Sequence, residues 1–393
     1  MQKYRLGDIC YIVSGSTPKS NIPEYWDGDV KWITPAEIGE DSYIITDSVR
    51  KITKLGVKKT GLSLLPKGTV LLSSRAPIGK VAIAGCDMYC NQGFKNLICS
   101  PQINNRYLYW FLKGNTVYIK SLGRGATFKE ISKKIVADIR ITLPTKEKQL
   151  NIVKQLEKIS IIIQLRKKEL NEYDNLIKSR FVEMFGDPQI NPFGWDVVNI
   201  SEVVHGKVSN GFFAKRDDYC EDGNVSVLGV ANIVNRMYSI IDELPRTYAI
   251  DKDIKKFEVK YGDMLFCRSS LVADGIGKAS IIPEDVQANV LFECHVIRLP
   301  LDLNKCIPEF MQVLSTMDFF RNQVIAQSKT ATMTTIGQDG ILNINIILPP
   351  IEKQKEFYDF VKQLDKSKLI IQKSLDELET LNKALIQKHF GGN

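Results

Sequence analysis

The chain has 393 residues, with 53 Lys plus Arg against 45 Asp plus Glu and a formal net charge of +8. At about 150 residues per domain, this length predicts two or three domains. An apolar fraction of 44% with 25% charged residues excludes a disordered chain. No apolar run approaches the ~20 residues that a membrane helix needs, and the first residues lack the pattern of a signal peptide. With eight Cys that we interpret as reduced thiols, the sequence predicts a cytoplasmic protein.

Residues 1–145 carry short β-branched and aromatic runs, such as Lys31–Thr34, Val70–Ser73 and Val81–Ala84. Gly, Pro and Asn separate these runs, which is typical of strands joined by turns. Tyr107–Lys113 has the composition of a short helix. We therefore expect residues 1–145 to form a mixed α/β domain.

Residues 146–186 have a different character. No Gly or Pro occurs between Lys146 and Met184, and Leu, Lys, Glu and Gln, which favour helices, are abundant. Apolar residues recur in steps of four and three, interrupted at Arg166 and Arg180, which predicts a long helix with one apolar seam. The residues of this seam are Ile152, Leu156, Ile159, Ile163, Leu170, Tyr173, Ile177 and Met184.

Residues 187–350 and 351–393 repeat the same two parts. The turn-forming segments Gly186–Pro188 and Asn191–Pro192 precede a second strand-rich region, in which Glu309–Leu314 predicts a short helix. No Gly or Pro then occurs between Ile351 and His389. The second seam is formed by Phe357, Val361, Leu364, Ile371, Leu375, Leu378 and Leu385, with Lys368 and Asn382 as interruptions.

Short matching segments show that the chain is a tandem repeat of about 190 to 200 residues. Their order is kept, and their offset grows only from 194 to 205. The matched pairs are Lys67–Leu72 with Tyr261–Phe266, Ile78–Ile83 with Ile276–Ile281, Ala126–Ile131 with Ala331–Ile336, Ile141–Gln149 with Ile346–Gln354, and Phe185-Gly186 with Phe390-Gly391. We predict an α+β protein in which two mixed domains are separated by two long helices that form an antiparallel coiled coil. The alternative is that each helix lies on its own domain.

The sequence offers little support for a catalytic or metal site. Neither Asn191-Pro-Phe193 nor Leu348–Ile351 matches the Asn/Asp-Pro-Pro-aromatic loop of amino-methyltransferases, and no phosphate loop ends in Gly-Lys-Ser/Thr. There are three His, and the nearest metal-like patterns are Cys86 with Cys90 and Cys294 beside His295. Because no second pair accompanies them, we interpret these Cys as small buried residues and predict no metal site.

The arrangement resembles the specificity (S) subunit of Type I restriction-modification systems over the whole chain. At the start of the first domain, the segments that resemble the family are Leu6–Ile9, Ser14–Pro18, Tyr25-Trp26 and Trp32-Ile33. The segments that resemble the family at the starts of the long helices are Leu143–Gln149 and Leu348–Gln354. Those at their ends are Phe181–Asp187 and Phe390-Gly391. The second domain departs from the pattern, since Val208–Gly211 stands where the first has Ser14–Pro18.

The resemblance implies a non-catalytic subunit that recognises double-stranded DNA. Each mixed domain reads one half of a bipartite target, and the helices set the spacer and dock two modification (methyltransferase) subunits. Motor-nuclease restriction subunits join them, and S-adenosylmethionine, ATP and Mg are expected on the partners, with no cofactor in this chain and no membrane. Two alternatives stay open: a restriction enzyme or methyltransferase fusion with an unrecognised catalytic site, and a protein that binds only other proteins.

Charge is distributed unevenly between the two copies. Residues 1–186 hold 30 Lys plus Arg and 17 Asp plus Glu, a net of +13, whereas residues 187–393 hold 23 and 28, a net of −5. Either partner subunits supply phosphate contacts, or basic residues of the second copy gather on one face.

Polar residues in corresponding loops are our candidates for contact with DNA. In the first copy they are Ser16, Thr17, Lys19, Arg75, Lys80, Asn91, Gln92, Lys95, Arg124, Thr127 and Lys129. In the second they are Lys207, Asn210, Lys215, Arg216, Arg268, Lys278, Lys329 and Thr332. Arg suits guanine and Asn or Gln suits adenine. Gly79-Lys80 and Gly277-Lys278 are either phosphate clamps or simple turns.

Overall fold

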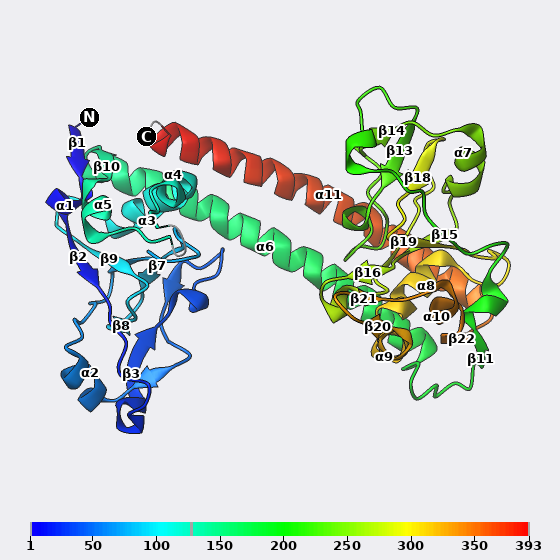
Figure 1. Cartoon of the computed structure of the whole chain (residues 1–393), viewed down its shortest axis with the longest axis horizontal. Coiled ribbons are helices and arrows are strands. Elements are labelled where there is room, and N and C mark those ends of the chain that lie inside the picture. Colours follow the sequence, from blue (N-terminus) through cyan, green and yellow to red (C-terminus); the bar gives the residue numbers. More distant parts are fainter. Residues whose placement is uncertain (1, 126–128, 392–393) are drawn as a thin grey trace. The chain divides into compact units, whose positions relative to one another are not determined.

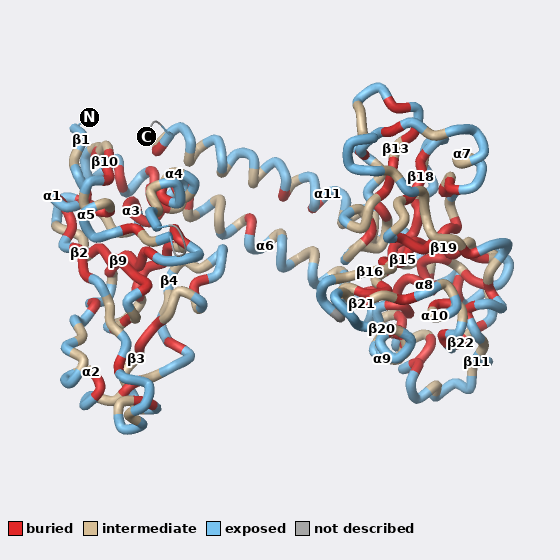
Figure 2. Tube along the Cα trace, in the orientation of Figure 1, coloured by how far each residue is buried: buried red, intermediate tan, exposed pale blue. Residues whose placement is uncertain are grey.

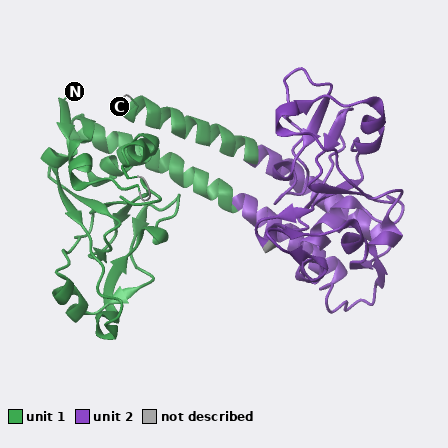
Figure 3. Ribbon diagram, viewed as in Figure 1, with its two compact units in different colours: residues 1–168, 372–393 green, residues 169–371 purple. Residues whose placement is uncertain are grey.

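The computed structural model describes residues 2–125 and 129–391. The chain divides into two compact units, coloured separately in Figure 3. Unit 1 comprises residues 1–168 and 372–393, and unit 2 comprises residues 169–371. Each unit therefore contains one mixed domain together with part of both long helices.

The described residues of unit 1 form three sheets, whose strands are labelled in Figure 1. Their strand orders are β1-β10, β2-β9-β6-β7-β4 and β5-β3-β8. The strands are β1 (Gln2–Arg5), β2 (Cys10–Ser14), β3 (Trp26–Ile33), β4 (Ile44–Ile45), β5 (Lys51–Ile52), β6 (Val70–Leu72), β7 (Val81–Ala84), β8 (Tyr89–Cys90), β9 (Lys95–Cys99) and β10 (Arg140–Leu143). The helices of its domain are α1 (Leu6–Ile9), α2 (Lys54–Thr60), α3 (Asn105–Gly114), α4 (Thr116–Ser121), α5 (Lys133–Asp138), η1 (Pro23–Tyr25) and η2 (Pro35–Glu37).

Unit 2 contains sheets β11-β22, β12-β19-β15-β17 and β14-β13-β18, and a further small sheet β16-β21-β20. The strands are β11 (Asp196–Asn199), β12 (Ser209–Asn210), β13 (Val225–Leu228), β14 (Arg246–Thr247), β15 (Asp263–Cys267), β16 (Ser269–Ser270), β17 (Ala279–Ile281), β18 (Val290–Phe292), β19 (Val296–Pro300), β20 (Lys329–Thr330), β21 (Thr334–Thr335) and β22 (Asn345–Leu348). The helices of its domain are α7 (Asp251–Phe257), α8 (Pro308–Ser315), α9 (Asp318–Gln327), α10 (Gln338–Leu342), η3 (Ile200–Val203), η4 (Arg216–Asp218), η5 (Val230–Asn232) and η6 (Ala273–Gly275).

Strand pairing confirms the tandem repeat. The antiparallel pair β1·β10 returns as β11·β22, with Gln2 opposite Leu143 and Asp196 opposite Leu348. The strands β2-β9-β6-β7 return as β12-β19-β15-β17. Even the parallel pair β3·β8 has its counterpart in β13·β18. The predicted α+β class with two mixed domains is therefore confirmed.

Both predicted short helices are present, and each is buried in its unit. Figure 2 shows the buried residues of the chain in red. In α3 every residue from Tyr107 to Leu112 is buried, and the Asn104 side chain caps the helix by accepting bonds from the amides of Arg106 and Tyr107. In α8 the residues from Pro308 to Ser315 are all buried. Pro308 at the first position suits a helix start, because its missing N–H needs no partner there.

The two long helices are α6 (Lys146–Phe185) and α11 (Ile351–Phe390), of 40 residues each. In each unit they form an antiparallel pair, held by an ion pair between Lys167 and Glu379 (2.9 Å) in unit 1 and between Lys368 and Asp174 (2.6 Å) in unit 2. The predicted antiparallel coiled coil is thus confirmed. Lys368, which interrupts the apolar seam, is only half-buried and uses its ammonium group for the second of these ion pairs.

A buried Gln anchors the first turn of each long helix. The Gln149 side chain accepts a bond from the Asn104 amide (2.8 Å) and donates to the carbonyls of Gln102 and Pro144. Gln354 accepts from the Ile307 amide (2.9 Å) and donates to the equivalent pair of carbonyls. Both are nearly inaccessible, with exposures of 1% and 0%.

We expect Gln149→Ala to lower the free energy of unfolding of unit 1 by about 2 to 3 kcal/mol, because it strands the buried Asn104 N–H and two carbonyls. Hydrogen exchange of amides in α3 measures this loss. The matched control is Gln155→Ala on an exposed position of the same helix, for which we expect a change within ~0.5 kcal/mol. Equal effects of the two changes would show that the Gln149 bonds contribute little.

Each long helix begins against the domain that precedes it and ends, in the other unit, against the short helix of that unit. In unit 1 the ring of Phe390, at the end of α11, lies 5.1 Å from that of Tyr107 and 6.1 Å from that of Phe111. In unit 2 the rings of Phe181 and Phe185, at the end of α6, lie 5.3 and 5.0 Å from that of Phe310. The alternative in which each helix lies on its own domain is therefore wrong.

Candidate nucleic-acid interface

In unit 1 the loop after β2 is held by two tryptophans. The Trp32 indole N–H donates to the Ser16 carbonyl (3.0 Å), and that of Trp26 donates to the Lys19 carbonyl (3.1 Å). These bonds fix the backbone and leave the side chains of Thr17 and Lys19 exposed.

The loop after β8 lies beside it. The Thr17 hydroxyl donates to the exposed Gln92 side chain. The Asn91 side chain, in contrast, accepts the Gly93 amide (2.9 Å) and so shapes its own turn. The structure therefore brings Ser16, Thr17, Asn91 and Gln92 together, with Thr17 and Gln92 outermost.

A second cluster surrounds Glu130. Its carboxylate accepts a bond from Arg75 Nε (3.0 Å) and another from Lys95 Nζ (3.1 Å). Burial on its own would raise the pKa of Glu130, but these two hydrogen bonds and positive charges outweigh burial and lower it. Lys95 is 7% exposed and also bonds to Ser74, so it positions Glu130, whereas Arg75 reaches solvent.

Arg124 pairs with Glu130 through the backbone, and Lys129 precedes Glu130 in the sequence. Arg124 and Glu130 exchange two backbone hydrogen bonds, of 3.0 and 2.9 Å, and Lys129 is exposed. Thr127, a predicted contact residue, lies outside the described residues.

The two Gly-Lys segments occupy equivalent turns. The Gly79 amide donates to the Ser73 carbonyl, and the Gly277 amide donates to the Cys267 carbonyl. Both Gly have positive φ, of 88° and 62°, a conformation that favours Gly. The geometry favours the turn interpretation.

The lysines of these segments are engaged by the protein. Lys80 Nζ donates to the Pro35 carbonyl (3.1 Å), and Lys278 Nζ bonds to Asn235 (2.9 Å) and Asp274 (2.8 Å). The bond from Lys278 lowers the pKa of Asp274.

In unit 2 three predicted residues lie on or next to the small sheet β16-β21-β20. Arg268 precedes β16 and donates to the Cys294 carbonyl (3.3 Å), Lys329 begins β20, and Thr332 is exposed in the turn before β21.

The other four predicted residues of unit 2 lie on the loops around β12. Asn210 is half-buried and pairs with Ile297 in the sheet, while Lys207, Lys215 and Arg216 are exposed. These basic side chains can contact phosphates, but the structure does not bring them into contact with the residues of the small sheet.

Sequence reasoning missed Glu130, Ser269 and His295. Ser269 Oγ and His295 Nδ1 lie 2.8 Å apart at an exposed position. The available signal is Cys294-His295, which the sequence presents only as a metal-like pattern. Glu130 carried no signal, because an acidic residue is unexpected in a contact surface for DNA.

The interpretation of the cysteines is confirmed for Cys90 and wrong for Cys86 and Cys294, which are half-buried. Cys86 Sγ donates to the Thr46 carbonyl (3.1 Å), next to β4, in an exposed setting. Within residues 2–125 and 129–391, no group of three or more His, Cys, Asp or Glu could hold a metal ion. Among the same residues, no helix is both long enough and apolar enough to cross a membrane.

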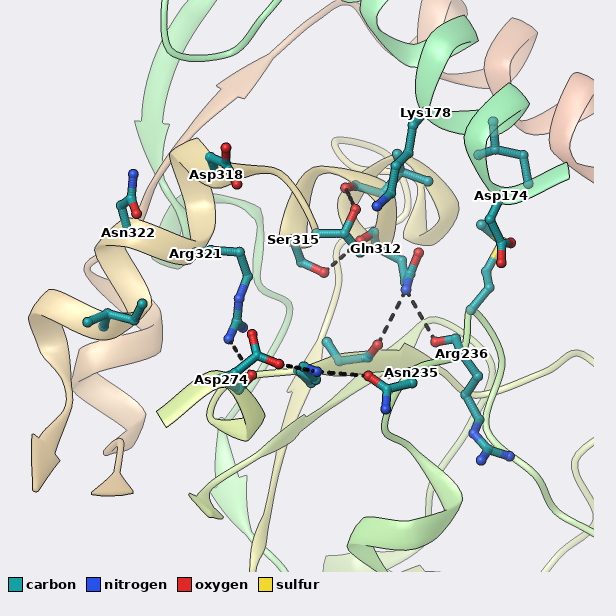
Figure 4. A pocket seen from close by; sticks show the side chains of 17 residues that line it. Asp174, Lys178, Asn235, Arg236, Asp274, Gln312, Ser315, Asp318, Arg321 and Asn322 are labelled. Carbon is teal, nitrogen blue, oxygen red and sulfur yellow. Dashed lines mark hydrogen bonds and ion pairs between the residues drawn. The ribbon is translucent and has the colours of Figure 1, made fainter. Parts of the chain in front are cut away.

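Each unit has a cleft where its domain meets the helix pair. The cleft of unit 2, of about 540 Å³, is shown in Figure 4, where Arg321 donates to the Asp274 carbonyl (3.0 Å) and Gln312 to that of Arg236 (3.2 Å). The cleft of unit 1, of about 250 Å³, is lined by Tyr43, Tyr109 and Lys113. Three helix residues of each cleft are repeat-equivalent at an offset of 205, namely Asp174, Ile177 and Lys178 in unit 2 and Glu379, Asn382 and Lys383 in unit 1. The cleft of unit 1 is also lined by Ser160, Ile163, Gln164 and Lys167 of α6.

The fold thus defines a protein with two equivalent mixed domains, each joined to the same antiparallel helix pair. The sequence model of the Type I restriction modification DNA specificity domain matches residues 1–173 and 192–380. The chain belongs to this family, as its resemblance predicts, and carries the domain twice.

Similar proteins agree with this assignment. The chain is 28% identical to the Type I restriction enzyme MjaIX specificity subunit of Methanocaldococcus jannaschii, over 98% of this chain and 91% of that protein. It is 25% identical to the StySPI specificity subunit of Salmonella potsdam, over 81% of this chain and 72% of that one. These relatives are specificity subunits, and the comparisons indicate no catalytic family.

Solved structures share the fold. The S subunit of a Type I restriction-modification system from M. genitalium matches with a TM-score of 0.54 at 14% identity, over 100% of this chain and 96% of that one. A chain from a type I R-M system, studied for its complex assembly and conformational transition, matches with a TM-score of 0.53 at 17% identity, over 100% and 97%.

Proposed function

We propose that this chain is the DNA-recognition subunit of a Type I restriction-modification complex, and that each mixed domain reads one half of a bipartite target. The observation that carries this proposal is the double match to the DNA specificity domain, in two separate segments. Two folded copies of one DNA-reading module suit a target with two halves, and their exposed loops supply side chains for base edges.

The helices would set the number of unread base pairs between the halves and dock two modification subunits. An antiparallel helix pair is stiff, as a spacer must be. The two repeat-equivalent clefts beside it support docking of two copies of the same partner. Motor-nuclease restriction subunits would then join this assembly.

The chemistry would belong to the partners. S-adenosylmethionine, ATP and Mg would bind to the modification and restriction subunits in the cytoplasm, and this chain would contribute recognition alone. The sequence contains neither a methyltransferase loop nor a phosphate loop with which to bind those cofactors.

We expect the purified chain neither to methylate nor to cleave DNA, and to support sequence-specific methylation once its modification subunits are added. The measurement is transfer of a radioactive methyl group to DNA, with host methyltransferases excluded. It is made once with the chain alone and once with the chain plus its modification subunits. Methyl transfer by the chain alone would favour the alternative of an enzyme with an unrecognised site. A lack of DNA binding by the assembled complex would favour a protein that binds only other proteins.

A further inference from the structure

The loops that follow β2 and β12 share one backbone framework. A Cβ added to Gly15 would meet the Cys90 carbonyl oxygen at 2.3 Å, and one added to Gly211 would meet that of Phe292 at 2.2 Å. No other residue fits either position. The residue after each Gly then bonds in the same way, since the Ser16 amide donates to the Cys90 carbonyl (3.0 Å) and the Phe212 amide to that of Phe292 (2.7 Å).

The segments beside these loops also correspond. The Ser74 amide donates to the Gly93 carbonyl (2.7 Å), and the Arg268 amide donates to the His295 carbonyl (2.9 Å). On the other side, Ile131 and Ile336 donate their amides to the carbonyls of Ser74 and Arg268. The backbone bonds therefore place Thr17 with Phe213, Arg75 with Ser269, Gln92 with Cys294, and Gly93 with His295.

The side chains on this shared backbone differ in chemistry. In unit 1 Thr17 is bonded to Gln92, and Arg75 is fixed by Glu130. In unit 2 Phe213 is 68% exposed, so an apolar ring stands at the surface where unit 1 has the hydroxyl of Thr17. Likewise, His295 is exposed and Ser269 Oγ holds its Nδ1.

Two domains that recognise different base sequences need the same backbone with different exposed side chains, and these loops have that arrangement. Side chains shared by both copies build the scaffold, whereas those that differ at equivalent exposed positions can discriminate bases. We propose that His295, positioned by Ser269, and Phe213 determine the base preference of the second domain, as Arg75 and Gln92 do in the first. This assignment rests on the proposed function and deepens it.

The chemistry of His295 indicates what it would recognise. A neutral imidazole has one donor and one acceptor nitrogen. When the Ser269 hydroxyl donates to Nδ1, the ring proton resides on Nε2. Nε2 is then a hydrogen-bond donor and would pair with an acceptor on a base. In the major groove such acceptors are N7 of a purine, O6 of guanine and O4 of thymine, and an apolar ring such as Phe213 suits the thymine methyl group.

The test uses the full chain in cells that carry its modification subunits, with the methylated sequences read by methylome sequencing. For His295→Ala we expect the preference at one base pair of one half-site to relax roughly tenfold, with the other half-site unchanged. The matched variant Gln92→Ala should relax the opposite half-site. Ser269→Ala should weaken the same base preference as His295→Ala, and Ser269→Thr, which keeps the hydroxyl, should restore it.

The outcomes separate this assignment from the proposed function. A bipartite motif that the His295→Ala change leaves intact, or uniformly weaker methylation with an unchanged motif, would overturn the assignment while the proposed function stands. Relaxation of both half-sites by one variant would also overturn it. If the unaltered chain directs no bipartite methylation, the proposed function itself fails and this assignment fails with it.

Discussion

Replacing residues 1–145 with the corresponding domain of a relative should change one half of the methylated sequence completely and leave the other half as it was. The physical reason is that the two domains have separate cores. The cluster that contains Leu6, Leu72 and Leu108 belongs to unit 1, whereas the cluster that contains Phe266 and Phe310 belongs to unit 2. Each of these two clusters lies within its own unit, so the base preference of the second domain should not change.

The join must respect two features of unit 1. The donor segment must end before Gln149, which anchors the start of α6. It must also present an aromatic pair like Tyr107 and Phe111, against which Phe390 packs, and an Asn like Asn115, whose side chain bonds to the Phe390 carbonyl (3.4 Å). In a chimera without these residues Phe390 would have nothing to pack against, which should cost about 2 to 3 kcal/mol of burial free energy.

Methylome sequencing of cells that carry the chimera and the partner subunits tests this expectation. The matched control replaces residues 187–350 in the same way, and should change the opposite half. A change in both halves after either replacement would contradict independent reading.

The repeat and the helices could be predicted because they depend on local sequence. Strand runs, turn residues and a Pro- and Gly-free heptad stretch are visible in any one copy, and matching offsets relate the two. A heptad pattern does not show which residues the last turn of each long helix packs against. In the sequence Phe181 and Phe390 are simply apolar positions, and only the folded chain shows that Phe181 packs against α8 and Phe390 against α3.

The candidate contact surface was predicted less completely, for a physical reason. Basic and amide side chains are exposed or buried according to their neighbours in space, which the sequence does not give. Lys95 was predicted at the DNA surface, yet it points inward because Glu130, 35 residues later, supplies its counter-charge. His295 is a candidate contact residue only because it is bonded to Ser269, which lies 26 residues away in the sequence.

Adding one heptad to each long helix should lengthen the unread spacer by roughly three base pairs. The insertions are placed beside Leu170 and Leu375, which are repeat-equivalent positions in the two seams. Seven residues extend a helix by ~10 Å at 1.5 Å per residue and keep the apolar seam in phase. B-DNA rises ~3.4 Å per base pair, which gives the expected increment.

The same insertion turns the domains about the duplex by something near a third of a helical turn, so affinity should fall unless the connections absorb the rotation. The half-site sequences should remain unchanged, since the insertions touch neither Gln92 nor His295. Four residues added to α6 alone provide the control, because they rotate its seam by about 40° and shift one helix against the other. They should break the ion pair between Lys167 and Glu379 and lower stability or partner binding.

The spacing between methylated half-sites in each variant shows whether the helix pair sets the spacer length. Circular dichroism and thermal unfolding must first show that the variant is folded. A spacer three base pairs longer in the double-heptad variant, with both half-sites kept, would establish the helix pair as the ruler. An unchanged spacer in that folded variant would mean that the helix pair does not fix the distance, which the proposed modification subunits would then have to set. The helices would then act only as the support on which those subunits dock.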